Sequence, residues 1–315
     1  MKLFVKGALV AILALSMTAC SLINDADQPF NVFDTKMDES IHYDKSVKGF
    51  SQIDLEMDIT VSEVEIISTN GTDIVFDQEA NLKELLATAK YEEHGDTLKV
   101  IYSNKDSYKL KAQSQNSKIT IKVPEEINIK IDSNLNVGDY KIDANKLTLT
   151  EVNLETNVGD TTLSSNADQN NLSYIKMSSD VGDLFLDIEN AEALDTVKLD
   201  TNTGKIKSYF DGNYEQRLEL VADTDVGDMQ LSFKGEFAEA VNLDLDANVG
   251  DVKLELPKGH ELIFDIKAPE FTSSLDWANI DYSKSRDQYK VDGDKSQFNI
   301  KINLNVGDGK FSYSN

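Results

Sequence analysis

A carboxylate that follows a glycine at nearly constant spacing is the most regular chemical group in this chain. The sequence Val-Gly-Asp occurs six times, and five of its aspartates fall between residues 139 and 251: Asp139, Asp160, Asp183, Asp228 and Asp251. If the repeats stack, neighbouring carboxylates lie about 5 Å apart and repel by about 1 kcal/mol even in water. Either hydrogen bonds to backbone amides and solvation relieve this repulsion, or the column forms weak sites for Ca²⁺, which takes oxygen ligands in flexible geometry. We expect no other metal site.

A single thiol, Cys20, is the second reactive group. It follows a basic start (Lys2 and Lys6), an apolar run over residues 8–15 and the small-residue sequence Met17-Thr18-Ala19. This arrangement is typical of a bacterial lipoprotein signal, too short in its apolar part for a transmembrane helix. We therefore expect a signal peptide over residues 1–19, lipidation of Cys20, and an extracytoplasmic protein that contacts the membrane through its N-terminal lipid. An ordinary secretory signal is the alternative.

Catalytic patterns are weak. His42, His94 and His260 all occur in polar or turn-rich surroundings, where solvated imidazoles are expected, and the sequence has no glycine-rich phosphate loop, metal-spaced histidine pair or nucleophile elbow. We expect no catalytic residue and no cofactor. The enzyme alternative is a polysaccharide-acting β-helix, whose site needs a carboxylate pair or a basic residue in a groove. Acids that recur at the same place in every repeat indicate a structural requirement instead.

The net charge of −25 limits the partners. Nucleic acids and anionic lipid surfaces attract clustered lysine and arginine, which this chain lacks. Cations, basic proteins, an envelope protein or a glycan remain as partners, and the acidity also keeps an exported protein soluble.

Glycines mark the corners of a repeat. From Gly138 to Gly250 the intervals are 21, 23, 22, 23 and 23 residues, counting the degenerate Gly204-Lys205 copy. The expected corners are Gly138, Gly159, Gly182, Gly204, Gly227, Gly250 and Gly307. Segments such as Val241-Asn242-Leu243-Asp244-Leu245 alternate apolar and polar residues and predict strands with one buried face. The sequence therefore predicts an all-β, β-helix-like solenoid of about 22-residue coils. The Asn or Asp two places before each glycine predicts a hydrogen-bonded ladder.

The segments outside the repeat suggest four regions. After the signal, residues 20–49 are polar and predict a flexible tether behind the lipidated cysteine. Residues 50–117 predict an irregular β region, with a worn corner at Ser62-Glu63 and a short helix over residues 82–89. Residues 91–102 predict either a strand or a hairpin turned at His94-Gly95-Asp96. Residues 118–315 hold the solenoid repeats.

The interval from Gly250 to Gly307 is 57 residues, more than two coils. Residues 256–274 fit one coil that has lost its glycine, with a corner at residues 271–274. Residues 275–295 are then an insertion, which holds Trp277, Tyr282 and Tyr289. These aromatic residues form either an exposed contact surface, since insertions in repeats often lie on the binding face, or a cap over the open end of the core.

The serial Gly-Asp corners, with Val123-Pro124-Glu125-Glu126 at a strand and Leu256-Pro257-Lys258-Gly259 later, resemble the bacterial envelope family of "putative adhesins", or toast-rack domains. The resemblance runs from residue 50 to the C-terminus. It implies a right-handed β-helix-like coil, an extracytoplasmic location, and no established enzymatic activity. We expect a lipid-anchored, non-catalytic binding, adhesion or scaffold module of the cell envelope. The alternative is an accessory regulator of envelope-stress sensing.

Overall fold

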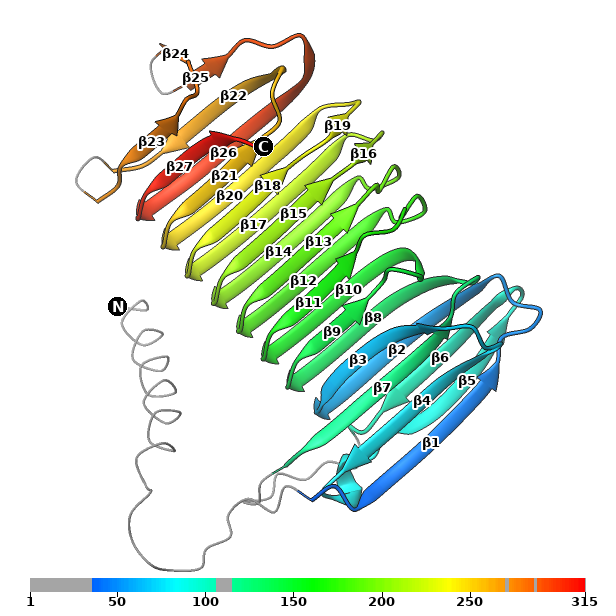
Figure 1. Ribbon diagram of the computed structural model, residues 1–315. Coiled ribbons are helices and arrows are strands. Elements are labelled where there is room, and N and C mark those ends of the chain that lie inside the picture. The colour runs from blue at the N-terminus through cyan, green and yellow to red at the C-terminus, as the bar shows by residue number, and fades with distance from the viewer. Residues whose placement is uncertain (1–35, 106–114, 270–271, 286–287, 315) are drawn as a thin grey trace, which may run out of the picture. The chain divides into compact units, whose positions relative to one another are not determined.

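The computed structural model describes residues 36–105, 115–269, 272–285 and 288–314. By its internal contacts the chain divides into residues 1–34 and a unit of residues 35–315, and only the second falls within the described ranges. This unit is built almost entirely of strands in two large sheets, here named sheet A and sheet B (Figure 1). The predicted signal peptide, Cys20 and the first part of the predicted tether lie outside the described residues.

Among the described residues, sheet A contains twelve strands. In spatial order they are β1 (Glu39–Ser46), β4 (Asp73–Ala80), β7 (Ser117–Pro124), β3 (Glu63–Thr69), β9 (Tyr140–Asp143), β11 (Thr161–Ser165), β13 (Leu184–Glu189), β15 (Ile206–Asp211), β18 (Met229–Phe233), β21 (Val252–Leu256), β27 (Gly309–Tyr313) and β23 (Leu275–Ala278).

In the part of the chain that the structure describes, sheet B contains thirteen strands. In spatial order they are β24 (Ser283–Ser285), β25 (Gln288–Val291), β22 (His260–Lys267), β26 (Lys295–Val306), β20 (Val241–Val249), β17 (Leu218–Val226), β14 (Thr196–Thr203), β12 (Tyr174–Val181), β10 (Thr148–Val158), β8 (Asn128–Val137), β2 (Gln52–Val61), β6 (Thr97–Ser103) and β5 (Thr88–His94). A third, small sheet pairs β16 (Asn213–Tyr214) with β19 (Glu236–Phe237).

Each coil consists of a long strand in sheet B, an Asn/Asp-Val-Gly-Asp corner, and a shorter strand in sheet A. The alternation of apolar and polar residues decides which side chains point into the core. In β20, Val241, Leu243 and Leu245 are buried, and the residues between them are partly exposed. Neighbouring coils are parallel and in register, so that Leu220 of β17 pairs with Leu243 of β20. The apolar side chains of both sheets meet in one continuous core, and the predicted β-solenoid is confirmed.

The N-terminal β region is more regular than the sequence predicts, because part of it forms a coil like those of the repeats. Strands β2 and β3 form a complete coil, and Ser62 at its worn corner donates its backbone N–H to the Val137 carbonyl at 3.0 Å. Strands β6 and β7 lie outside this coil, each parallel to its neighbour. The predicted hairpin is confirmed as β5–β6. The predicted helix over residues 82–89 is only a short 3₁₀ turn, η1 (Lys83–Leu85).

The prediction of a tether up to residue 49 is wrong from residue 39 onward. Residues 39–46 form β1, which pairs antiparallel with β4 over eight residue pairs and closes the edge of sheet A. Ile41 and Tyr43 alternate with polar residues and pack against the core, where the Tyr43 ring centroid lies 6.0 Å from that of Phe76. The alternation of apolar and polar residues in β1 covers few residues, and its apolar side is buried only because β4 lies beside it.

At the C-terminal end the spatial order of the coils departs from the sequence order. The last coil in the chain, β26–β27, stacks directly on the Gly250 coil, while β22–β23 lies outside it. A corner without glycine is present as expected, because Gly307 donates its N–H to the Thr272 carbonyl at 3.1 Å. The predicted insertion over residues 275–295 is wrong at its start, since Leu275–Ala278 is strand β23 of that coil. Only β24 and β25 form an added antiparallel hairpin.

Within the described ranges, no helix is long and apolar enough to cross a membrane.

Candidate functional site

The corner edge of the solenoid brings together the residues that the repeat predicts. Its glycines are required by close stacking as well as by backbone conformation. Gly159 has φ +147°, and a Cβ atom built on it would lie 1.8 Å from the carbonyl oxygen of Gly138 in the preceding coil. Gly159 also donates its N–H to the Val181 carbonyl of the next coil at 2.9 Å. The same contact recurs at every predicted corner: Gly138, Gly159, Gly182, Gly204, Gly227, Gly250 and Gly307.

The predicted ladder before the glycines is confirmed. The Asn202 Nδ2 atom donates to Asp180 Oδ1 at 3.0 Å, and Asn248 Nδ2 donates to Asp225 Oδ1 at 2.6 Å. Each amide thus contacts the carboxylate of the preceding coil. An amide between two carboxylates prevents direct contact between like charges in this column.

The column of aspartates after the glycines is relieved by backbone amides. One oxygen of each carboxylate accepts the N–H of the equivalent residue in the next coil: Asp139 from Asp160 at 2.8 Å, and Asp160 from Asp183 at 2.7 Å. Lys205, which interrupts the column, donates its N–H to Asp183 at 2.8 Å. Of the two readings that the sequence leaves open, this geometry favours hydrogen bonding to the corner amides.

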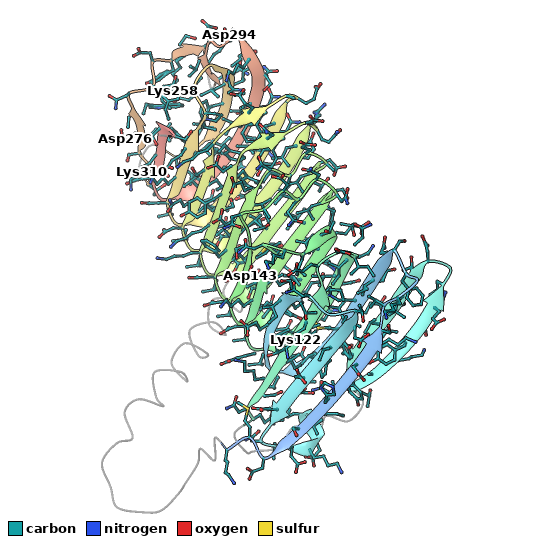
Figure 2. All side chains as sticks on the ribbon, turned by 45° about the vertical axis from the view of Figure 1, so that its right-hand side comes forward. Lys122, Asp143, Lys258, Asp276, Asp294 and Lys310 are labelled. Atoms are coloured by element: carbon teal, nitrogen blue, oxygen red, sulfur yellow. The ribbon has the colours of Figure 1, made fainter. Side chains whose placement is uncertain are left out.

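Two lysines also neutralise part of this column. Lys205 Nζ lies 3.9 Å from Asp228 Oδ2, and Lys310 Nζ lies 2.8 Å from Asp251 Oδ2. The hydrogen bond from Lys310, together with the N–H of Asp308, lowers the pKa of Asp251. Figure 2 shows Lys310 at the C-terminal end of the solenoid, near Asp276 on the neighbouring strand. In the parts of the chain that the structure describes, no three histidine, cysteine or acidic side chains converge to hold a metal ion.

A column of buried hydroxyl groups behind the corners is a feature that the sequence analysis missed. Ser179, Thr201 and Thr224 donate to the carbonyl oxygens of Gly159, Gly182 and Gly204, at 3.1, 3.0 and 3.3 Å respectively. These bonds satisfy the carbonyl groups that the corner turns inward. The signal was available, because Ser or Thr directly precedes the Asn or Asp of these corners.

The aromatic residues of β23 and of the C-terminal hairpin form a cap. Trp277 lies 4.9 Å from Phe264, 4.6 Å from Phe311 and 4.9 Å from Tyr289 between ring centroids. Tyr289 is buried, whereas Tyr282 keeps 43% of its surface exposed. The structure therefore favours the capping alternative for Trp277 and Tyr289, because β22, β23 and β27 place the indole ring over the end of the core.

His260 is not the solvated side chain that the sequence predicts. Only 2% of its surface is exposed. Its Nδ1 atom contacts the Ser296 carbonyl at 3.0 Å, and its ring packs edge-on against Phe298 with centroids 5.2 Å apart. Burial lowers the pKa of His260. His42, by contrast, is exposed and lies 2.6 Å from Asp77.

The outer face of sheet B carries registered columns of polar side chains. Asn299 donates to Asn242 at 2.8 Å, and Asn242 donates to Glu219 at 2.6 Å, across three neighbouring strands. They border a shallow hollow of about 440 Å³ with Val221 and Ile263 in its lining. A second hollow of about 260 Å³ is lined by Lys130, Asp132, Glu151, Asn153, Tyr174 and Lys176. This face is broad and offers many hydrogen-bonding groups.

Between these hollows the same face is strongly acidic. Asp200 and Asp223 are register partners on β14 and β17, and Asp223 also pairs with Asp246 on β20. Burial and the neighbouring Asp225 raise the pKa of Asp200, and burial with Asp246 and Asp200 raises that of Asp223. The protein therefore holds like charges close together here, at a cost to stability.

Several solved structures are similar to this chain. One is a "putative cell adhesion protein" from Clostridium sporogenes, with 15% identity, coverage of 88% of this chain and 100% of that chain, and a TM-score of 0.36. A "putative adhesin" from Bacteroides fragilis has 17% identity, coverage of 87% and 97%, and a TM-score of 0.38. Another from Parabacteroides merdae has 8% identity, coverage of 88% and 97%, and a TM-score of 0.33.

No curated protein matches the chain. A family profile does match, over residues 51–312, which covers the series of coils from β2 to β27. The chain belongs to the toastrack DUF4097 family.

Proposed function

We propose that this protein is a non-catalytic binding module of the bacterial cell envelope, held at a membrane by a lipid on Cys20 and acting in adhesion or as a scaffold. The outer face of sheet B carries this proposal. Its polar side chains form registered columns from β8 to β26 around shallow hollows. Such a surface suits a ligand that makes many similar contacts along its length.

The closed ends of the solenoid also support a binding role. Exposed sheet edges invite pairing with other chains. Here the edge strands are short or charged: β1 and β5 at one end, and β23 and β24 at the other. The side faces are thus the extended surfaces left for a partner.

Cosedimentation with isolated envelope fractions tests the proposal. The Cys20→Ser protein, which lacks the lipid, is mixed with cell-wall and membrane fractions, and the bound and free protein are measured together with any soluble sugar released. We expect saturable binding to at least one fraction without release of sugar products. Release of sugar fragments would show the polysaccharide-acting enzyme instead. Absence of saturable binding to every fraction would refute the binding role.

A further inference from the structure

Two aromatic side chains project from the outer face of sheet A, on the opposite side of the molecule from the hollows of sheet B. Phe185 belongs to β13 and Tyr209 to β15, with ring centroids 5.8 Å apart and ring planes inclined by 52°. The register pairs Phe185 with Lys207 and Asp187 with Tyr209. The four side chains therefore form a square in which the rings occupy one diagonal and the charged groups the other. We name this group the aromatic square.

The strands on both sides surround the aromatic square with hydroxyl and amide groups. Thr162 and Ser164 of β11 pair with Phe185 and Asp187, and Gln230 of β18 pairs with Lys207. An apolar patch with a polar border of this kind differs from the core of a protein interface, which is larger and depleted of charge. Two half-buried rings fall well below the roughly 800 Å² per partner of a stable protein interface.

The carboxylate of Asp187 makes no hydrogen bond or ion pair to any other described residue, although the residue is half buried. Burial, and then the nearby Asp211, raise the pKa of this carboxyl group. A carboxylate partly withdrawn from water and left without a partner is destabilising. Hydroxyl groups of a ligand would supply the missing donors.

We propose that the aromatic square, Phe185, Asp187, Lys207 and Tyr209, binds a hydroxyl-rich glycan through one or more of its sugar rings. The C–H face of a pyranose is apolar and its rim carries hydroxyl groups, so it matches an aromatic ring bordered by hydrogen-bonding side chains. Strands lie about 4.8 Å apart, close to the width of one sugar ring. A glycan that crosses the strands can therefore place successive sugars over β13, β15 and their neighbours. This site is separate from the hollows of sheet B, so it adds a second surface and a ligand class to the binding role proposed above, on which it rests.

Affinity gel electrophoresis tests the site with the full-length chain in detergent. The probes are soluble neutral polysaccharides of different linkage (a mixed-linkage β-glucan, a galactomannan and a xyloglucan), and an anionic polygalacturonate. The variants are Phe185→Ala and Tyr209→Ala, together with Phe185→Leu and Tyr209→Leu, which keep an apolar side chain on the strand but remove the ring. Tyr282→Ala is the matched control, because Tyr282 is an exposed aromatic residue outside both the aromatic square and the hollows of sheet B. Tyr174→Ala probes the hollow on the outer face of sheet B.

We expect at least one neutral polysaccharide to retard the protein, and both Tyr209 variants and both Phe185 variants to weaken its binding about tenfold or more. The Tyr282→Ala variant should bind as the unmodified protein does. If the alanine variants lose binding because they unfold, while the leucine variants bind as the unmodified protein does, the aromatic rings are not needed and the proposal is overturned. Retardation by polygalacturonate alone, or by none of the probes, would also overturn it.

The same gels separate this inference from the proposed function. If Tyr174→Ala loses binding and the sheet A variants keep it, the glycan site lies on sheet B, so the aromatic square is wrong while the binding role stands. If no probe binds but the protein still sediments with an envelope fraction, the inferred ligand class is wrong and the proposed function is not.

Discussion

The substitution Gly159→Ala tests the stacking of the corners most directly. The added Cβ atom would lie 1.8 Å from the carbonyl oxygen of Gly138 and 2.5 Å from its carbonyl carbon. Neither atom belongs to a flexible side chain, so the two coils must separate at this corner. Three hydrogen bonds cross the interface there: Gly138 N–H to Val158 at 2.9 Å, Tyr140 N–H to Asp160 at 2.9 Å, and Asp160 N–H to Asp139 Oδ1 at 2.8 Å.

These contacts give the magnitude. Each hydrogen bond contributes about 1 kcal/mol net to stability, and the backbone conformation at φ +147° adds about 1 to 2 kcal/mol for a residue with a side chain. The expected loss is about 4 kcal/mol. Two other glycines provide matched controls. Gly95 has φ +65° but no atom within 4 Å of its Cβ position, so Gly95→Ala should cost only about 1 kcal/mol. Gly71 has neither a positive φ nor an atom closer than 3.5 Å to its Cβ position, so Gly71→Ala should change stability by less than about 0.5 kcal/mol.

Urea unfolding followed by circular dichroism measures all three variants. Because coils interact mainly with their neighbours, a broken corner can also split the transition into two, so both the midpoint and the slope are compared. A Gly159→Ala protein that unfolds within about 1 kcal/mol of Gly95→Ala would refute the close stacking of the corners.

Four further outcomes follow from the same features. Cys20→Ser should move the protein from the membrane fraction to the soluble fraction, because one thiol carries all acyl attachment; palmitate labelling that persists in this variant would contradict the lipid anchor. Calcium should raise the melting temperature no more than sodium chloride of matched ionic strength, because one carboxylate oxygen of Asp160 already accepts a hydrogen bond from a backbone amide. A larger effect of calcium that is lost in Asp160→Asn would instead support cation binding by the aspartate column. Asp223→Asn should stabilise the protein at about pH 7, because a raised pKa means that the charged carboxylate costs stability above that pKa. The gain should vanish as the pH falls below the pKa of the unfolded chain, and a gain that is independent of pH and salt would show another cause. Trp277→Ala should lower the stability of the C-terminal cap by about 2 to 3 kcal/mol, measured by thermal unfolding, and an unchanged melting curve would mean that the indole ring does not close the core.

The repeated part of the fold could be predicted from the sequence because its physical rules are local. Alternation in segments such as residues 241–245 fixes which side chains are buried, and the recurring glycine fixes where the chain turns. The worn corner at Ser62 was recognisable for the same reason, since Val61 and Val64 still flank it in the pattern of the other corners. The hydrogen-bonded columns then follow from stacking in register.

The ends of the solenoid could not be predicted in this way, because long-range pairing decides them. Ile41 and Tyr43 form too short a pattern to indicate a strand until β4 lies beside them. The 57-residue interval fits several coil orders equally well, and pairing of β22 with β26 selects the one observed. Phe185, by contrast, could have been found: it lies between the buried Leu184 and Leu186, so alternation already places it on the outer face.

The uniform interior and the specialised ends of the solenoid have a consequence for how proteins of this architecture can change in length. Each coil between Gly159 and Gly250 makes the same corner bonds to the coil before and the coil after it. Duplication of one such segment, for example residues 182–203, would therefore add a coil without disturbing the register of the others. A duplication at either end would instead break a cap. Gene duplications should thus be tolerated only in the middle, and each would lengthen the stack by about 4.8 Å.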